Sequence, residues 1–184
     1  MKIVERPYAE ASRRALLEAG MHPVLARVYA GRNIRSATEL AYGVDGLIAP
    51  ASMKGLDKAA ALLADAIAQG KRLLIIADYD ADGATACAVG IRALRAFGAT
   101  VEYLVPDRFK LGYGLSPELV ELAAQRKPDL LITVDNGIAS VEGVARAKSL
   151  GIGTLITDHH LPGAVLPAAE CIDPTRHRCR VSAL

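Results

Sequence analysis

Acidic and histidine residues follow directly after three short apolar segments of this chain. The three junctions read RLLIIA-DYDADG at residues 72–83, LLITV-DNG at residues 130–137 and GTLIT-DHH at residues 153–160. Their ionisable side chains are Asp78, Asp80, Asp82, Asp135, Asp158, His159 and His160. Carboxylates and imidazoles of this kind serve as general acids, general bases and metal ligands.

The spacing of the acidic residues favours metal binding. Asp78, Asp80 and Asp82 repel one another near neutral pH unless cations neutralise them or water screens them. Carboxylates and imidazoles without thiolates suit Mn²⁺ or Mg²⁺, and a histidine ligand favours Mn²⁺. Two such ions, about 3.5–4 Å apart and bridged by a carboxylate, activate water and neutralise a phosphoryl group during in-line displacement. The predicted chemistry is hydrolysis of a phosphoester or phosphoanhydride.

Each junction also has a simpler interpretation when it is taken alone. Asp82-Gly83 and Asn136-Gly137 are ordinary turn dipeptides, and an aspartate can simply cap the helix that follows it. The pair His159-His160 is also compatible with a structural loop. The three junctions together favour a metal site, because they would lie on one rim of a parallel sheet.

The segments that must position these residues alternate between strand and helix. Apolar runs predict strands over residues 72–77, 100–105, 130–134 and 153–157. Helical spacing, caps and glycine stops predict helices over residues 55–70, 83–97 and 140–150, and a further helix that opens at Ser116-Pro117. We therefore predict an α/β fold with a doubly wound, mostly parallel sheet flanked by helices.

The first 54 residues have a different pattern. Helices are predicted over Glu10–Ala19 and His22–Gly31, followed by a connector that contains glycine and proline. We predict a helical N-terminal extension over residues 1–54 and the α/β domain over residues 55–184.

Composition excludes several classes of protein. The 184 residues are 52% hydrophobic with a net charge of +2, which is incompatible with a disordered chain and lacks the strong basic field of many nucleic-acid-binding domains. No apolar stretch approaches the roughly 18–20 residues that a membrane span needs, and no apolar segment follows the first charges as in a secretory signal. The 3 cysteines form no disulfide framework, so we expect a cytoplasmic protein.

The junctions resemble the first three motifs of the DHH phosphoesterase family. These motifs are DYDADGAT at residues 78–85, VDNG at residues 134–137 and TDHH at residues 157–160. The segments GMHP (20–23), RFKLGYGL (108–115) and HHLPG (159–163) are similar to those of the family's exonucleases that act on single-stranded DNA. The resemblance implies a Mn²⁺- or Mg²⁺-dependent 5′→3′ exonuclease that works in DNA recombination and repair.

The resemblance also implies roles for the residues that surround two ions. Asp80 and Asp82 would each hold a different ion, Asp135 would bridge both ions, and His159 would be a further ligand. His160 would contact the scissile phosphate, so that Asp135 and His160 are the catalytic residues.

Four further residues would support these ligands or bind the substrate. Asp78 and Asp158 would orient the ligands through hydrogen bonds. Arg108 and Tyr113 would contact a substrate phosphate, since a guanidinium matches phosphate bidentately. A solvated loop arginine and a plain Gly-Tyr-Gly turn are the alternative interpretations.

One departure from the family pattern concerns a fourth motif. Family members with two ions use a further aspartate after the DHH motif, whereas this chain offers only Asp173, which we predict to end another strand. We therefore expect the DHH domain to be truncated at its C-terminal end. By itself, this chain should bind metal weakly and have little activity. We also expect a monomer. For the whole enzyme, the resemblance implies single-stranded DNA as the substrate and single-strand-binding protein and a helicase as protein partners.

The last residues suggest two weaker features. Cys171, His177 and Cys179 could bind zinc, although their spacing is not that of a standard finger and a fourth ligand is missing. The basic run over residues 176–180 could contact a DNA backbone or form a solvated tail.

Three other functions compete with the exonuclease. A haloacid-dehalogenase-like phosphatase also has Asp-x-Asp-Gly after its first strand, but it leaves Asp158-His159-His160 unexplained. Another DHH enzyme, such as an oligoribonuclease or a cyclic-dinucleotide phosphodiesterase, would share the metal site. A non-catalytic DHH scaffold would have lost metal ligands, whereas this chain has every ligand of the first three motifs.

Overall fold

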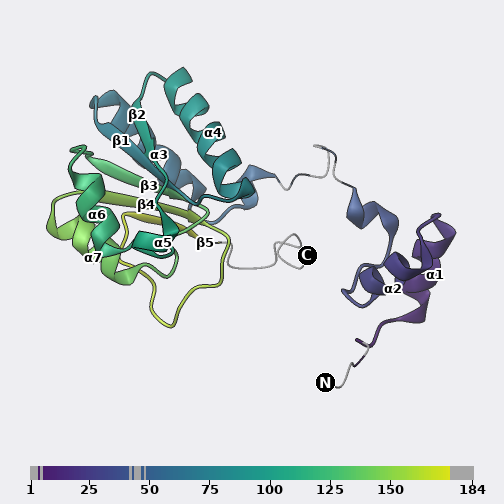
Figure 1. Cartoon of the computed structure of the whole chain (residues 1–184). Helices are drawn as coiled ribbons and strands as arrows, with labels where there is room; N and C mark the ends of the chain where they lie inside the picture. The colour runs from purple at the N-terminus through teal and green to yellow at the C-terminus, as the bar shows by residue number, and fades with distance from the viewer. Residues whose placement is uncertain (1–3, 5, 42, 44–46, 48, 175–184) are drawn as a thin grey trace. The chain divides into compact units, whose positions relative to one another are not determined.

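The computed structural model describes residues 4, 6–41, 43, 47 and 49–174, which divide into two compact units (Figure 1). Within these residues, the first unit extends to Ala49 and the second begins at Pro50. The division lies close to the boundary that we predict after residue 54.

The second unit is built on a five-stranded sheet in which all neighbouring strands are parallel. The strands are β1 (Arg72–Ala77), β2 (Thr100–Leu104), β3 (Leu130–Val134), β4 (Gly153–Asp158) and β5 (Cys171–Pro174). Their order is β2-β1-β3-β4-β5, so the chain moves outward from β1 in both directions. The predicted doubly wound parallel sheet is confirmed, and Asp173 lies in a fifth strand as predicted.

Within the part of this unit that the structure describes, five α-helices connect these strands or precede them. They are α3 (Leu56–Ala68), α4 (Ala81–Ala96), α5 (Arg108–Leu111), α6 (Pro117–Ala124) and α7 (Val141–Ser149). Helix α4 begins two residues before the predicted start at Gly83, because the Asp80 side chain accepts a hydrogen bond from the Gly83 N–H and caps the helix at 3.3 Å. The short helix α5 is absent from the sequence prediction.

The helices cover both faces of the sheet (Figure 1). Side chains alternate along β1, so that Leu73 and Ile75 pack with the α3 and α4 side while Leu74 and Ile76 pack with α6 and α7. All four side chains are at most 2% exposed. This burial on two faces explains why the strand sequences are continuously apolar.

The first unit contains α1 (Glu10–Glu18), α2 (Pro23–Ala30) and a short 3-10 helix, η1 (Ala37–Leu40). Its small core gathers around Leu16, Ala26 and Ala30. A further 3-10 helix, η3 (Pro50–Ser52), lies at the start of the second unit. Among the described helices of both units, none has the length and apolar character that a membrane span requires.

Candidate metal centre

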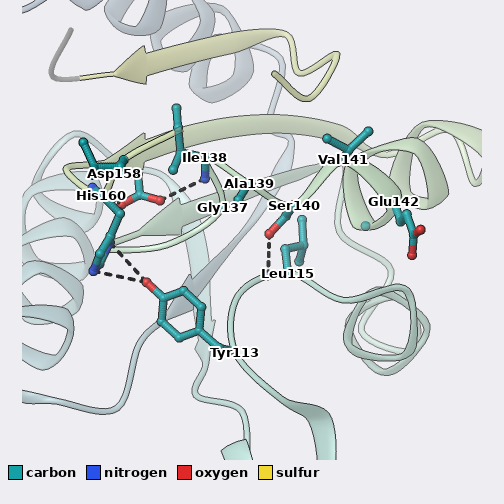
Figure 2. Close-up of a pocket in the computed structure, with 12 residues that line it drawn as sticks. Tyr113, Leu115, Gly137, Ile138, Ala139, Ser140, Val141, Glu142, Asp158 and His160 are labelled. Atoms are coloured by element: carbon teal, nitrogen blue, oxygen red, sulfur yellow. Dashed lines mark hydrogen bonds and ion pairs between the residues drawn. The ribbon is translucent and has the colours of Figure 1, made fainter. Parts of the chain in front are cut away.

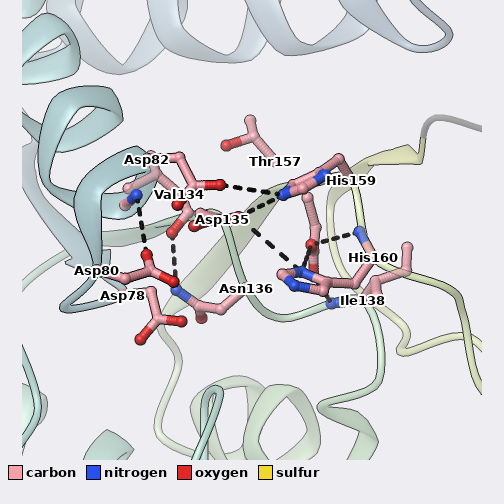
Figure 3. Close-up of polar contacts among 12 residues, drawn as sticks. Asp78, Asp80, Asp82, Val134, Asp135, Asn136, Ile138, Thr157, His159 and His160 are labelled. Atoms are coloured by element: carbon pink, nitrogen blue, oxygen red, sulfur yellow. Dashed lines mark hydrogen bonds and ion pairs between the residues drawn. The ribbon is translucent and has the colours of Figure 1, made fainter. Parts of the chain in front are cut away.

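The three junctions meet at the carboxyl ends of adjacent central strands. Ala77 at the end of β1 is in register with Val134 of β3, and Val134 is in register with Thr157 of β4. The residues that follow, Asp78 and Asp135, continue this alignment through backbone bonds from Asp78 N to Val134 O (3.4 Å) and from Asp135 N to Thr157 O (3.0 Å). The acidic and histidine side chains therefore lie together on one rim of the sheet (Figure 3).

The first junction turns sharply from β1 into α4. Asp80 caps the helix and Asp82 lies in its first turn, where the free backbone N–H groups favour negative charge. A Cβ atom on Gly83 would lie 2.6 Å from the carbonyl oxygen of Asp78. The close packing of strand against helix thus requires glycine at this position.

The second junction has a strained backbone that is held by a buried amide. Asp135 has φ = 62°, in the left-handed region that most side chains avoid. The Asn136 Nδ2 group donates to the carbonyl of Ile76 (3.1 Å) and to the carbonyl of Val134 (2.9 Å), which connects the ends of β1 and β3. Asn136 is thus more than the turn residue that its sequence suggests, because its side chain joins two strands that are distant in sequence.

The third junction orients His160 through Asp158. Oδ1 of Asp158 accepts a hydrogen bond from the backbone N–H of His160 (2.9 Å) and lies 2.7 Å from Nδ1 of its ring. Oδ2 of Asp158 accepts from the N–H of Ile138 (2.9 Å), so the loop after β3 positions the carboxylate. The Tyr113 hydroxyl lies 3.1 Å from Nδ1 of His160 and donates to the carbonyl of Asp135 at 3.3 Å.

Asp135 is common to two groups of possible metal ligands. One group is Asp78, Asp80 and Asp135, and the other is Asp135, His159 and His160, with the ligand atoms of each group within 4.8 Å of one another. Nε2 of His159 lies 2.8 Å from Oδ1 of Asp135. The shared position is that of a residue able to bridge two ions.

Asp82 belongs to neither of these groups, yet it lies beside them. Its carboxylate is 3.6 Å from Nε2 of His159 and is largely exposed. From the sequence, we expect Asp78 only to orient the ligands. One of its carboxylate oxygens, however, lies within 4.8 Å of carboxylate oxygens of Asp80 and Asp135, which is close enough for all three to bind one ion. The structure therefore gathers all the predicted ligands and adds Asp78 to the possible set.

Electrostatics at this rim reflect crowded negative charge. Burial raises the pKa of Asp135, and the nearby charge of Asp82 raises it further. The pKa of Asp82 itself is lowered, chiefly because its carboxylate accepts a hydrogen bond from its own backbone N–H. Burial opposes the charged form of His160, but the hydrogen bond to Asp158 and its negative charge outweigh burial and raise the pKa of His160.

The residues fit divalent cations of the Mn²⁺ or Mg²⁺ type. Oδ1 of Asp135 is buried and, among the described residues, has no partner with hydrogen-bond geometry, although Nε2 of His159 is close. A buried carboxylate oxygen without a donor is costly unless a cation compensates it. The donor set of oxygens and imidazole nitrogens suits Mn²⁺ or Mg²⁺.

Arg108 reaches this centre from α5. Its guanidinium lies 3.6 Å from Oδ2 of Asp78, 4.1 Å from the centroid of the Tyr79 ring and 5.4 Å from that of Tyr113. The side chain remains 40% exposed. Arg108 is therefore held at the rim with donors available to a ligand.

A cavity of about 420 Å³ adjoins the centre on the His160 side (Figure 2). Its lining includes Tyr113, Asp158, His160 and the segment from Gly137 to Gly143, which comprises the loop after β3 and the first turn of α7. The predicted basic run (Arg176, Arg178 and Arg180) and two of the alternative zinc ligands, His177 and Cys179, lie outside the described residues.

Known proteins with similar sequences are exonucleases. The chain is 48% identical over 172 residues to the single-stranded-DNA-specific exonuclease RecJ of Salmonella typhimurium, covering 92% of this chain and 30% of the relative. It is 39% identical over 160 residues to the RecJ exonuclease of Thermus thermophilus, covering 87% of this chain and 23% of the relative. The chain thus spans less than a third of the length of these relatives.

Two solved structures have the same fold as this chain. A crystal structure of exonuclease RecJ bound to manganese matches 66% of this chain and 31% of its own chain, with a TM-score of 0.62 and 40% identity. Thermus thermophilus RecJ in complex with Mn²⁺ matches 93% of this chain and 24% of its own, with a TM-score of 0.62 and 32% identity.

A family model described as the N-terminal domain of the DHH family matches residues 72–183. The match begins at β1 and includes all three junctions. On this match, and on the geometry of the rim, the chain belongs to the DHH family.

Proposed function

We propose that this chain forms the metal-binding part of an exonuclease that hydrolyses single-stranded DNA in the 5′→3′ direction. The observation that carries this proposal is the convergence of carboxylates and histidines on Asp135. Its Oδ1 is buried and, among the described residues, has no hydrogen bond of good geometry, although Nε2 of His159 lies 2.8 Å away. The names of the similar proteins supply the substrate, since they are single-stranded-DNA-specific exonucleases.

Asp80, Asp82, Asp135 and His159 would hold two Mn²⁺ or Mg²⁺ ions, with Asp135 shared between them. When bound, these ions supply an activated water and neutralise charge on the phosphodiester. The solved relatives that contain Mn²⁺ support this choice of metal. Asp78 is close enough to join the ligands or to orient them.

Other residues of the chain would position the substrate around the ions. His160, oriented by Asp158 and contacted by Tyr113, donates a hydrogen bond to the scissile phosphate. Arg108 pairs with a phosphate through its exposed guanidinium, as it now pairs with Asp78. Tyr113 adds a ring beside that phosphate.

The proposal extends to the setting of the enzyme. We place the protein in the cytoplasm, acting in DNA recombination and repair as a monomer. Single-strand-binding protein and a helicase are its proposed partners, because a helicase produces the single strands that it would degrade and single-strand-binding protein covers them.

The test is a nuclease assay on the complete gene product with Mn²⁺. Single-stranded DNA labelled at its 5′ end should release labelled mononucleotide first, whereas a 3′ label should remain on progressively shorter strands. Asp82→Ala and Asp135→Ala should each abolish hydrolysis and leave the far-ultraviolet circular dichroism unchanged. Nuclease activity near that of the unmodified protein in either variant would overturn the two-metal assignment.

A further inference from the structure

The chain contains only 2 phenylalanines, and one of them, Phe109, has a side chain that is 99% exposed. Phe109 lies on α5 between Arg108 and Lys110. A phenylalanine usually gains stability from burial, so complete exposure gives this side chain no role in the core of the second unit.

The backbone of α5 is held in place without the Phe109 side chain. The Asp107 carboxylate caps the helix by accepting a hydrogen bond from the Phe109 N–H at 3.0 Å. Arg108 connects the same helix to the candidate metal centre through Asp78 and the ring of Tyr79. Phe109 is thus presented to solvent by a segment that is anchored at the rim.

The surroundings of Phe109 combine aromatic surface with positive charge. Tyr79 and Tyr113, which both neighbour Arg108, are 51% and 50% exposed. The Lys110 side chain is 81% exposed, with its Nζ atom 3.5 Å from Asp107. Proteins that bind single strands combine such cations, which contact the phosphates, with aromatic rings on which bases stack.

We propose that Phe109 is a stacking platform for a base of single-stranded DNA that approaches the metal centre. Arg108 and Lys110 would contact the phosphates on either side of the stacked nucleotide. This inference rests on the proposed function, and it adds a residue that recognises an unpaired base. Bases in a duplex stack on each other, so the platform favours a single strand.

The absence of tryptophan from the sequence permits a specific test. In the complete gene product, Phe109→Trp adds a tryptophan to residues 1–184, which otherwise have none, and stacking on a base should quench its emission. Phe97→Trp is the matched control, since Phe97 is 73% exposed at the C-terminal end of α4. Helix α4 starts at the rim and runs back along the sheet, which places Phe97 at the opposite edge.

The titrant is an oligothymidylate of roughly ten nucleotides, added in the presence of Mg²⁺. Its phosphorothioate linkages resist hydrolysis. We expect saturable quenching with Phe109→Trp, no quenching with Phe97→Trp, and little quenching when the oligonucleotide is abasic. Equal responses of the two variants, or equal quenching by the abasic strand, would overturn the proposal. Blue-shifted emission of Phe109→Trp without added DNA, unchanged during the titration, would also overturn it, because another part of the polypeptide would then cover the ring.

A binding assay gives a second measurement. Phe109→Ala should raise the Kd for single-stranded DNA by about five- to 150-fold, and Phe109→Trp should restore tight binding. Phe97→Ala should leave the Kd unchanged. If the unmodified protein binds single strands with these responses but never hydrolyses them, the proposed function fails while the platform stands.

Discussion

Nδ1 of His160 lies 2.7 Å from Oδ1 of Asp158, a carboxylate whose side chain is 1% exposed. The same oxygen accepts from the His160 backbone N–H, and the other oxygen accepts from Ile138. A buried carboxylate with these partners fixes the orientation of the ring and determines which ring nitrogen carries the proton.

Asp158→Asn should therefore impair His160 without removing a proposed metal ligand. We expect DNA hydrolysis to fall by about 10- to 100-fold, because the ring loses its charged partner. The pKa of His160 should fall, since the hydrogen bond and charge of Asp158 now raise it. A pH–rate profile of the complete gene product, together with an NMR titration of the metal-free chain, measures both effects.

Asp129→Asn is the matched control for this change. Asp129 accepts a hydrogen bond from the Arg72 N–H (2.7 Å) at the amino ends of the strands, opposite the rim that holds the candidate metal centre. Its replacement should leave the pH–rate profile unaltered. An identical loss of rate in both variants would show that Asp158 acts through general stability only.

Asp135→Asn should stabilise the metal-free chain and remove its response to metal. Folding raises the pKa of Asp135, so the folded chain binds this proton more tightly than the unfolded chain does. The metal-free fold consequently loses stability as the pH rises through that raised pKa. Asparagine avoids this cost and tolerates the φ of 62°.

Thermal unfolding at about pH 8, where free histidine is neutral, measures the effect. In EDTA, the Tm of Asp135→Asn should exceed that of the unmodified chain by a few degrees, on the order of 1 kcal/mol. Mn²⁺ should raise the Tm of the unmodified chain and leave that of the variant nearly constant. An equal Mn²⁺-induced rise in both proteins would contradict the assignment of Asp135 as a shared ligand.

Asn136→Asp should destabilise the second unit more than Asn136→Ala does. The Nδ2 group donates to the carbonyls of Ile76 and Val134, and aspartate would place a carboxylate oxygen against both. Alanine removes the two donors without adding repulsion, at a cost of about 1–3 kcal/mol. In urea unfolding at neutral pH, the unmodified protein should be the most stable, Asn136→Ala the next and Asn136→Asp the least stable. An Asn136→Asp protein more stable than Asn136→Ala would refute the bridge between β1 and β3.

Gly143→Ala should be strongly destabilising even though alanine favours helices. A Cβ atom at this position would lie 1.8 Å from the carbonyl oxygen of Leu115, so the loop before α6 would have to move. We expect a loss of at least about 2 kcal/mol in unfolding free energy. Gly90→Ala is the control, because its Cβ would meet only the terminal Cδ1 of Ile75 at 2.9 Å. Similar midpoints for the two variants in urea would show that the Leu115 loop adapts freely.

Much of the fold could be predicted because its signals are local. The apolar runs that predict β1 and β3 match the observed strands at both ends. Ser116 and Pro117 open α6 as predicted, with the Ser116 hydroxyl accepting from the Leu119 N–H at 3.2 Å. Helix α5 could not be predicted, because its four residues are too few for an apolar period.

The sequence by itself determined which residues reach the rim, because parallel strands bring their carboxyl ends to one edge whatever lies between them. Only the tertiary structure decided how those residues are held. The bridge made by Asn136 depends on a strand that lies 60 residues earlier in the sequence. The ion pair between Arg108 and Asp78 depends in the same way on the approach of α5 to the end of β1. The full exposure of Phe109 is likewise a tertiary property, because burial is set by what packs against a side chain and not by the side chain itself.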